Sequence, residues 1–277
     1  MTDQSPEPSP RGHPTPRTSR WRVIRILNLA ALLLGLLDRT GAGATQAEQA
    51  SRGSQETGQD LALRLRTVMP QAQSTNQAML KIRGTHGRTQ VPVVVIARPG
   101  SGGWSVEYRV GRAGSEPGLQ VWTIHHRLDG APRYQRHQPA SSATNTTATT
   151  AMATVTEAQG SETLGGGDFE LRELGMEFFH WPDQRLRGRE LSNGRWCQVL
   201  ESRSGRPDGP AVVRSWIDEN LGVLLSAEVY DGRQRRLKQF SVTQFREQGD
   251  RWSCSVSMVD DRRGTKTELS FDGPAPR

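Results

Sequence analysis

Five histidines follow residue 44 and are the first candidates for metal binding or acid–base chemistry: His86, His125, His126, His137 and His180. His125 and His126 are adjacent in a segment of strand-like composition. Successive side chains of a strand point to opposite faces, so these two cannot both bind one ion. Most metal sites need three or four convergent ligands. We therefore predict neither a metal site nor a cofactor.

Paired carboxylates are the second candidate, because two acidic side chains can act as general acid and general base. Asp260, Asp261 and Glu268 are close in the sequence, but the aspartates lie at an expected turn beside Arg262 and Arg263. Solvated, charge-paired side chains explain this pattern better. The sequence also contains no nucleophile elbow, zinc-protease, phosphate-loop, dinucleotide-binding or C-x-x-C motif. We predict that the protein is not an enzyme.

The amino terminus has the pattern of a signal peptide. Five arginines between residues 11 and 25 precede an apolar stretch, Ile26–Leu37, and Ala42–Gly43–Ala44 supplies small residues for cleavage. These twelve residues, apolar apart from Asn28, are fewer than the roughly 20 that span a bilayer. We predict a cleaved signal peptide at 1–44 and a periplasmic product. The alternative is an uncleaved leader that anchors the protein to the inner membrane.

After cleavage we expect a flexible terminus at 45–58 and a single domain at 59–277. Within this domain a tract rich in Ala, Thr and Ser predicts a disordered insertion at about 139–166. The leader contains six of the 36 Lys and Arg residues but only three of the 29 Asp and Glu residues. The remaining net charge is small, so we predict no nucleic-acid partner.

The two cysteines, Cys197 and Cys254, would meet an oxidising compartment after export. Both lie in segments of strand-like composition. A disulfide between neighbouring or facing strands is one interpretation, and it would stabilise the fold by roughly 3–4 kcal/mol in the chain-entropy model. Two buried free thiols that pack as small apolar groups are the other interpretation.

Strand-like segments follow one another through the last third of the chain. In them β-branched or aromatic residues alternate with polar ones, and turn residues separate them. They are Arg195–Glu201, Ala211–Asp218, Val223–Tyr230, Arg236–Phe245, Arg251–Val259 and Thr265–Phe271. Four more precede the Ala/Thr/Ser tract: Ala78–Arg83, Gln90–Ala97, Trp104–Val110 and Leu119–Leu128. The pattern is typical of an antiparallel sheet with one apolar face.

Two helices are expected. Asp60–Met69 is compatible with a short helix that Pro70 ends. Asp168–Trp181 has an N-cap residue at its start, Pro182 after its end and an apolar stripe that must lie against the sheet. We expect the second helix to act as a lid.

The carboxy-terminal third resembles bacterial outer-membrane lipoprotein-sorting proteins, which are similar in fold to the periplasmic lipoprotein carrier. The segments that carry the resemblance are Leu186–Glu190, Gly194–Glu201, Arg214–Asp218, Leu225–Asp231, Met258–Asp260 and Thr265–Leu269. The resemblance extends more weakly back to about residue 60. It contains no catalytic signature.

The resemblance implies an α+β fold in which a large antiparallel sheet bends into a half-barrel and helices cover its concave side. It implies a monomeric, non-catalytic carrier that binds acyl chains of lipoproteins or phospholipid and passes them to an acceptor protein of the inner or outer membrane. The alternative is an envelope sensor or scaffolding module that binds a protein through the same groove.

An acyl-chain cavity would be lined by apolar side chains of the sheet and the lid, since it needs apolar area without directional bonds. The simpler alternative for each residue is that it fills the core. The candidates are Val93, Val95, Val106, Tyr108, Trp122, Leu174, Phe178, Trp181, Val199, Trp216 and Phe240.

Overall fold

The computed structural model describes residues 56–85, 87–111, 119–138, 154–206, 209–248 and 251–274. The predicted signal peptide, most of the predicted flexible terminus, His86 and residues 139–153 of the predicted insertion lie outside these ranges. No helix within the described ranges is long and apolar enough to cross a membrane.

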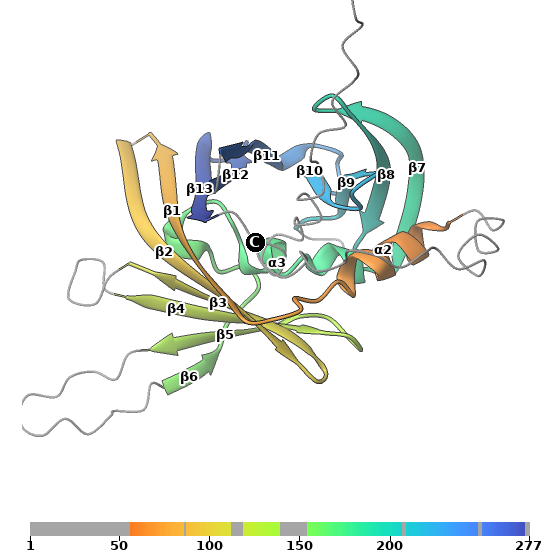
Figure 1. The fold of residues 1–277 in the computed structure, drawn as a ribbon. Coiled ribbons are helices and arrows are strands. Elements are labelled where there is room, and N and C mark those ends of the chain that lie inside the picture. The colour runs from red at the N-terminus through yellow and green to blue at the C-terminus, as the bar shows by residue number, and fades with distance from the viewer. Residues whose placement is uncertain are drawn as a thin grey trace, which may run out of the picture.

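Thirteen antiparallel strands form one open sheet that curves into a half-barrel (Figure 1). Across the sheet the order is β6-β5-β4-β3-β2-β1-β13-β12-β11-β10-β9-β8-β7. The first and last strands therefore pair in the middle, and β6 and β7 form the two edges. The strands are β1 Ser74–Gly84, β2 Gly87–Gly100, β3 Gly103–Val110, β4 Gln120–Arg127, β5 Arg133–Gln138, β6 Thr154–Glu157, β7 Asp183–Ser192, β8 Arg195–Arg203, β9 Val212–Asp218, β10 Leu224–Tyr230, β11 Arg236–Gln248, β12 Arg251–Asp260 and β13 Thr265–Pro274.

Alternating apolar and polar residues account for most of these strands. All ten strands predicted from the sequence are confirmed, with bounds that differ by a few residues. Asn193 and Gly194 close the β7–β8 hairpin at φ of 51° and 74°, as a two-residue turn of this kind requires. β5, β6 and β7 were not among the ten, because their sequences RYQRHQ, TVTE and DQRLRGRELS contain few apolar residues.

Helix α2, Gly58–Arg66, begins with a capping box between Thr57 and Asp60. Its buried residues include Leu61 and Leu65, and it packs against β7 and β8. A Cβ on Gly58 would lie 2.4 Å from the main-chain oxygen of Gln184, so the helix approaches β7 too closely for a larger residue. The predicted amino-terminal helix is thus confirmed, although it ends at Arg66.

Residues 158–182, here called the inner segment, connect the edge strands β6 and β7 and run through the space inside the curve of the sheet (Figure 1). This segment contains three short helical turns: η3 Leu164–Gly166, α3 Leu171–Leu174 and η4 Glu177–His180. Ala158 and Leu164 are buried. The prediction of a disordered insertion is therefore wrong from Thr154 onward, where β6 and the inner segment are ordered.

The single helix predicted at Asp168–Trp181 is also wrong. The N-cap of α3 is Glu170, which forms a capping box with Glu173. Met176 then adopts a left-handed conformation with φ of 50°, which ends the helical path before η4. The Asp168 carboxylate, expected to cap the helix, contacts the sheet instead.

The core lies between the concave face and the inner segment. Gly165, at φ 58°, is pressed against the sheet, because a Cβ there would lie 2.9 Å from side-chain atoms of Leu80 and Val110.

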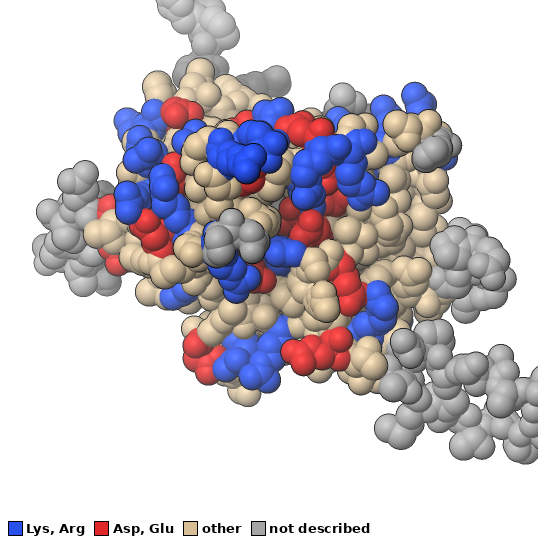
Figure 2. Space-filling model, turned by 180° about the vertical axis from the view of Figure 1, so that it is seen from behind, with Lys and Arg blue, Asp and Glu red and all other residues tan. Residues whose placement is uncertain are grey.

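The surface seen from behind has basic and acidic side chains next to one another, without a continuous basic area (Figure 2).

Candidate functional site between the inner segment and the sheet

Two rows of cross-strand neighbours on β11, β12 and β13 face the inner segment. The first row is Lys238, Asp260 and Thr265, and the second is Phe240, Met258 and Thr267. Residues two apart on a strand share a face, so both rows point into the curve of the sheet. A polar row thus borders a mainly apolar one.

Lys238 is buried, with 3% of its surface exposed, and no other lysine or arginine is buried among the residues whose side chains the structure describes. Its Nζ donates to the main-chain oxygen of Asp168 at 2.9 Å, to Oε1 of Glu170 at 2.9 Å and to Oε2 of Glu173 at 3.1 Å. An ammonium group has three donors, and these oxygens satisfy all of them. All three acceptors belong to the inner segment.

Asp168 makes a second set of contacts with the sheet. The hydroxyls of Thr265 and Thr267 donate to its carboxylate at 2.5 and 2.8 Å, and its amide donates to the Thr267 hydroxyl at 2.9 Å. Arg263 approaches the same carboxylate at 3.6 Å. Asp168 is 1% exposed, so these bonds replace its hydration.

The two glutamates around Lys238 have one buried counter-ion between them. Burial raises the pKa of Glu173 to about 7, Lys238 opposes the rise and Glu170 adds to it. Asp260 lies beside Lys238 in the sheet, but Arg262 donates to its carboxylate at 2.9 and 3.2 Å. The charge of Lys238 is therefore balanced mainly by the inner segment.

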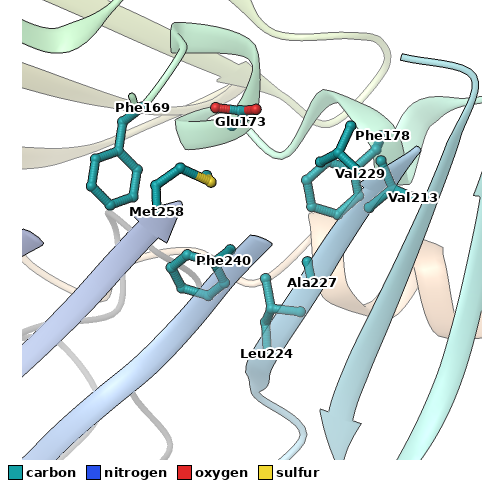
Figure 3. A pocket seen from close by; sticks show the side chains of 9 residues that line it. All are labelled: Phe169, Glu173, Phe178, Val213, Leu224, Ala227, Val229, Phe240 and Met258. Carbon is teal, nitrogen blue, oxygen red and sulfur yellow. The ribbon is translucent and has the colours of Figure 1, made fainter. Parts of the chain in front are cut away.

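A small apolar cavity adjoins this cluster (Figure 3). Its lining residues come from the inner segment and from β9 to β12: Phe169, Glu173, Phe178, Val213, Leu224, Ala227, Val229, Phe240 and Met258. Its volume is about 20 Å³. That is close to the roughly 10–15 Å³ needed for one water and far below the roughly 300–1,000 Å³ of ligand pockets. The groove is closed in this structure.

Nine of the eleven predicted cavity residues lie between the concave face and the inner segment. Val93, Val95, Val106, Tyr108 and Trp122 are buried on neighbouring strands β2, β3 and β4. Leu174, Phe178 and Trp181 belong to the inner segment, and Phe240 lies on β11. Of these nine, Phe178 and Phe240 line the cavity, whereas the other seven are packed into the core around it.

Val199 and Trp216 do not fit the predicted cavity. They pair with each other across β8 and β9. Val213 and Ile217 belong to the core, and Trp216 is an odd number of residues from each of them. Because side chains alternate along a strand, Trp216 points to the opposite face. Its indole instead donates to Glu190 at 2.8 Å in an exposed position. Both residues belong to the convex face.

Cys197 and Cys254 are buried free thiols. They lie on β8 and β12, with three strands between them. At about 4.8 Å per strand they are well beyond the roughly 4.4–6.8 Å between the Cα atoms of a disulfide. The free-thiol interpretation is therefore correct. Burial raises the pKa of Cys197 to about 11 and that of Cys254 to about 12.

The adjacent histidines separate as expected. His125 bonds to Gln135 at 2.8 Å, whereas His126 is buried and stacks on Trp104 with ring centroids 4.4 Å apart. Burial and the nearby His180 and His125 lower the pKa of His126 to about 3. Within the described ranges, no three His, Cys, Asp or Glu side chains are placed to hold a metal ion.

The sequence did not single out Lys238, Glu170 or Glu173. One signal was available, because Lys238 stands two residues before Phe240 in a predicted strand and so shares its inward face. A charged residue at an inward position needs a buried partner.

A family model that carries the description of an uncharacterized protein matches residues 147–275. No curated protein matches the chain.

Several solved structures have a similar fold. A DUF1329 family protein from Desulfovibrio piger has a TM-score of 0.62 at 16% identity, over 79% of this chain and 91% of its own. A putative outer membrane lipoprotein-sorting protein domain from Vibrio parahaemolyticus also scores 0.62, at 17% identity, over 78% of this chain and 92% of its own. A LolA superfamily protein from Nitrosomonas europaea scores 0.55 at 15% identity, over 80% and 94%. The chain therefore has the fold of the outer-membrane lipoprotein-sorting and LolA superfamily proteins, as the resemblance in its sequence predicted.

Proposed function

We propose that the protein is a non-catalytic periplasmic carrier that binds acyl chains of a lipoprotein or a phospholipid between the inner segment and the concave face. The observation that carries this proposal is the apolar concave wall, which the inner segment covers with short turns instead of a continuous helix. α2 packs against β7 and β8. An acceptor in the inner or outer membrane would receive the ligand.

Binding requires the inner segment to move, because the present cavity is too small for an acyl chain. The contacts of Phe169 and Phe178 with the sheet would be exchanged for contacts with the chain. Each buried methylene contributes about 0.8 kcal/mol, so a chain can offset the loss of these contacts. A ligand favours the open state only if it binds that state more tightly than the closed state.

Native mass spectrometry with lipid extraction, on protein purified from the periplasm without detergent, tests the proposal. Ala227 lines the cavity, whereas its neighbour Ser226 points to the other face of β10. We expect Ala227→Phe to abolish lipid co-purification and uptake of a fluorescent fatty acid, and Ser226→Phe to leave both intact. Protein that carries no lipid and takes up no fatty acid would refute the carrier function. Co-purification of a protein instead would favour the scaffolding alternative.

A further inference from the structure

The sheet presents a set of hydrogen-bond donors to the inner segment. Lys238 Nζ on β11 and the hydroxyls of Thr265 and Thr267 on β13 all contact Asp168, and Arg263 lies 3.6 Å from the same residue. Lys238, Thr265 and Thr267 occur at adjoining positions of the two rows that face into the curve. Together they form a cradle for negatively charged oxygen.

The acceptors that occupy this cradle all belong to one element, the inner segment. They are the carboxylates of Asp168, Glu170 and Glu173 and the main-chain oxygen of Asp168. When the inner segment leaves the sheet, the cradle loses every one of them at once. Asp260 stays, but its carboxylate is bonded to Arg262.

A buried ammonium without acceptors is strongly disfavoured, because its desolvation cost is no longer offset. A neutral hydrocarbon that enters the groove cannot supply the missing acceptors. A ligand with an anionic headgroup can. The row beside the cradle, which includes Phe240 and Met258, leads directly into the apolar cavity.

We infer that the open groove selects an amphiphile with a carboxylate or phosphate headgroup. The headgroup takes the place of Asp168, Glu170 and Glu173 on Lys238, Thr265 and Thr267, and the apolar chain lies against Phe240 and Met258. In the closed state the acidic side chains of the inner segment imitate this headgroup. The inference rests on the proposed carrier function and specifies its class of ligand.

Delipidated protein titrated with cis-parinaric acid and with its methyl ester tests the inference, since the ester keeps the same apolar chain but has no headgroup charge. Hydrogen bonds to a charged group contribute roughly 1.5–3 kcal/mol, so we expect the acid to bind about 10- to 100-fold more tightly than the ester. Equal affinities would overturn the inference and leave the carrier function standing. If neither probe bound, both would be overturned.

Three variants locate the effect. Lys238→Met should bring the acid-to-ester ratio close to one, and Thr267→Val should reduce it. Lys81→Met is the matched control, because Lys81 pairs with Glu268 at 3.4 Å in a partly buried position on the other face, and it should leave the ratio unchanged. A ratio that persists in folded Lys238→Met would contradict the inference.

Titration with inorganic phosphate separates a lipid headgroup from a free anion. We expect millimolar phosphate to weaken binding of the acid only slightly, and phosphate binding as tight as that of the acid would overturn the assignment to an amphiphile.

Discussion

Lys238→Met is the substitution whose effect on stability follows most directly from the structure. It removes the ammonium group and preserves most of the length and apolar character of the side chain. Three hydrogen bonds are lost, and Glu170 and Glu173 lose their shared buried counter-ion. Glu170 retains Arg172 at 2.8 Å, whereas Glu173 forms no ion pair with a second cation in the described part of the chain.

Removal of one partner from a buried ion pair costs about 3–5 kcal/mol, because the remaining charge stays desolvated. We expect this loss in the free energy of unfolding at pH 8, where Glu173 is ionised. At pH 5 the loss should be smaller, because Glu173, whose pKa is about 7, binds a proton there. The triple variant Lys238→Met/Glu170→Gln/Glu173→Gln removes the stranded charges and should recover most of the loss.

Urea unfolding at pH 8 and pH 5, followed by tryptophan fluorescence, measures these differences. Lys81→Met provides the surface control and should cost less than about 1 kcal/mol. The reasoning would be refuted if Lys238→Met cost less than about 1 kcal/mol at pH 8. It would also fail if the triple variant were no more stable than the single one.

Three further predictions concern the inner segment and the thiols. Gly165→Ala should lower the free energy of unfolding by about 1–3 kcal/mol more than Gly166→Ala, since both residues have positive φ but only a Cβ at Gly165 meets the sheet; equal losses in urea unfolding would contradict this. The folded pKa of Glu173, about 7, exceeds the unfolded value of 4.5, so its contribution to stability is present below pH 4.5 and is lost as pH rises to 7. Glu173→Gln should therefore gain roughly 3 kcal/mol relative to the parent protein between pH 4.5 and 7, and parallel pH profiles would count against the raised pKa. Cys197 and Cys254 should both resist a thiol reagent in the native protein and react in urea. Rapid labelling of either thiol in the native protein would contradict its burial.

Much of the sheet could be predicted because a strand with one buried face has a period of two that a single sequence displays. The same period places Trp216 on the convex face, opposite Val213, and Val199 is its cross-strand partner. Selecting residues by apolar character alone missed this. Local pattern serves strands well because each strand buries its face against a common core.

The inner segment was harder to predict, because tertiary contacts decide its conformation. Asp168 is a good N-cap by residue type, yet two threonine hydroxyls about 100 positions later in the chain take its carboxylate. Met176 adopts a left-handed conformation that its residue type does not favour. Lys238 and its glutamates are about 70 positions apart, and no local signal joins them.

The inner segment joins β6 to β7 and so links the two edges of the sheet. One end of the segment is attached to each half of the half-barrel. If the sheet flattened, its two edges would move apart. The inner segment would then have to straighten and release its contacts with the concave face.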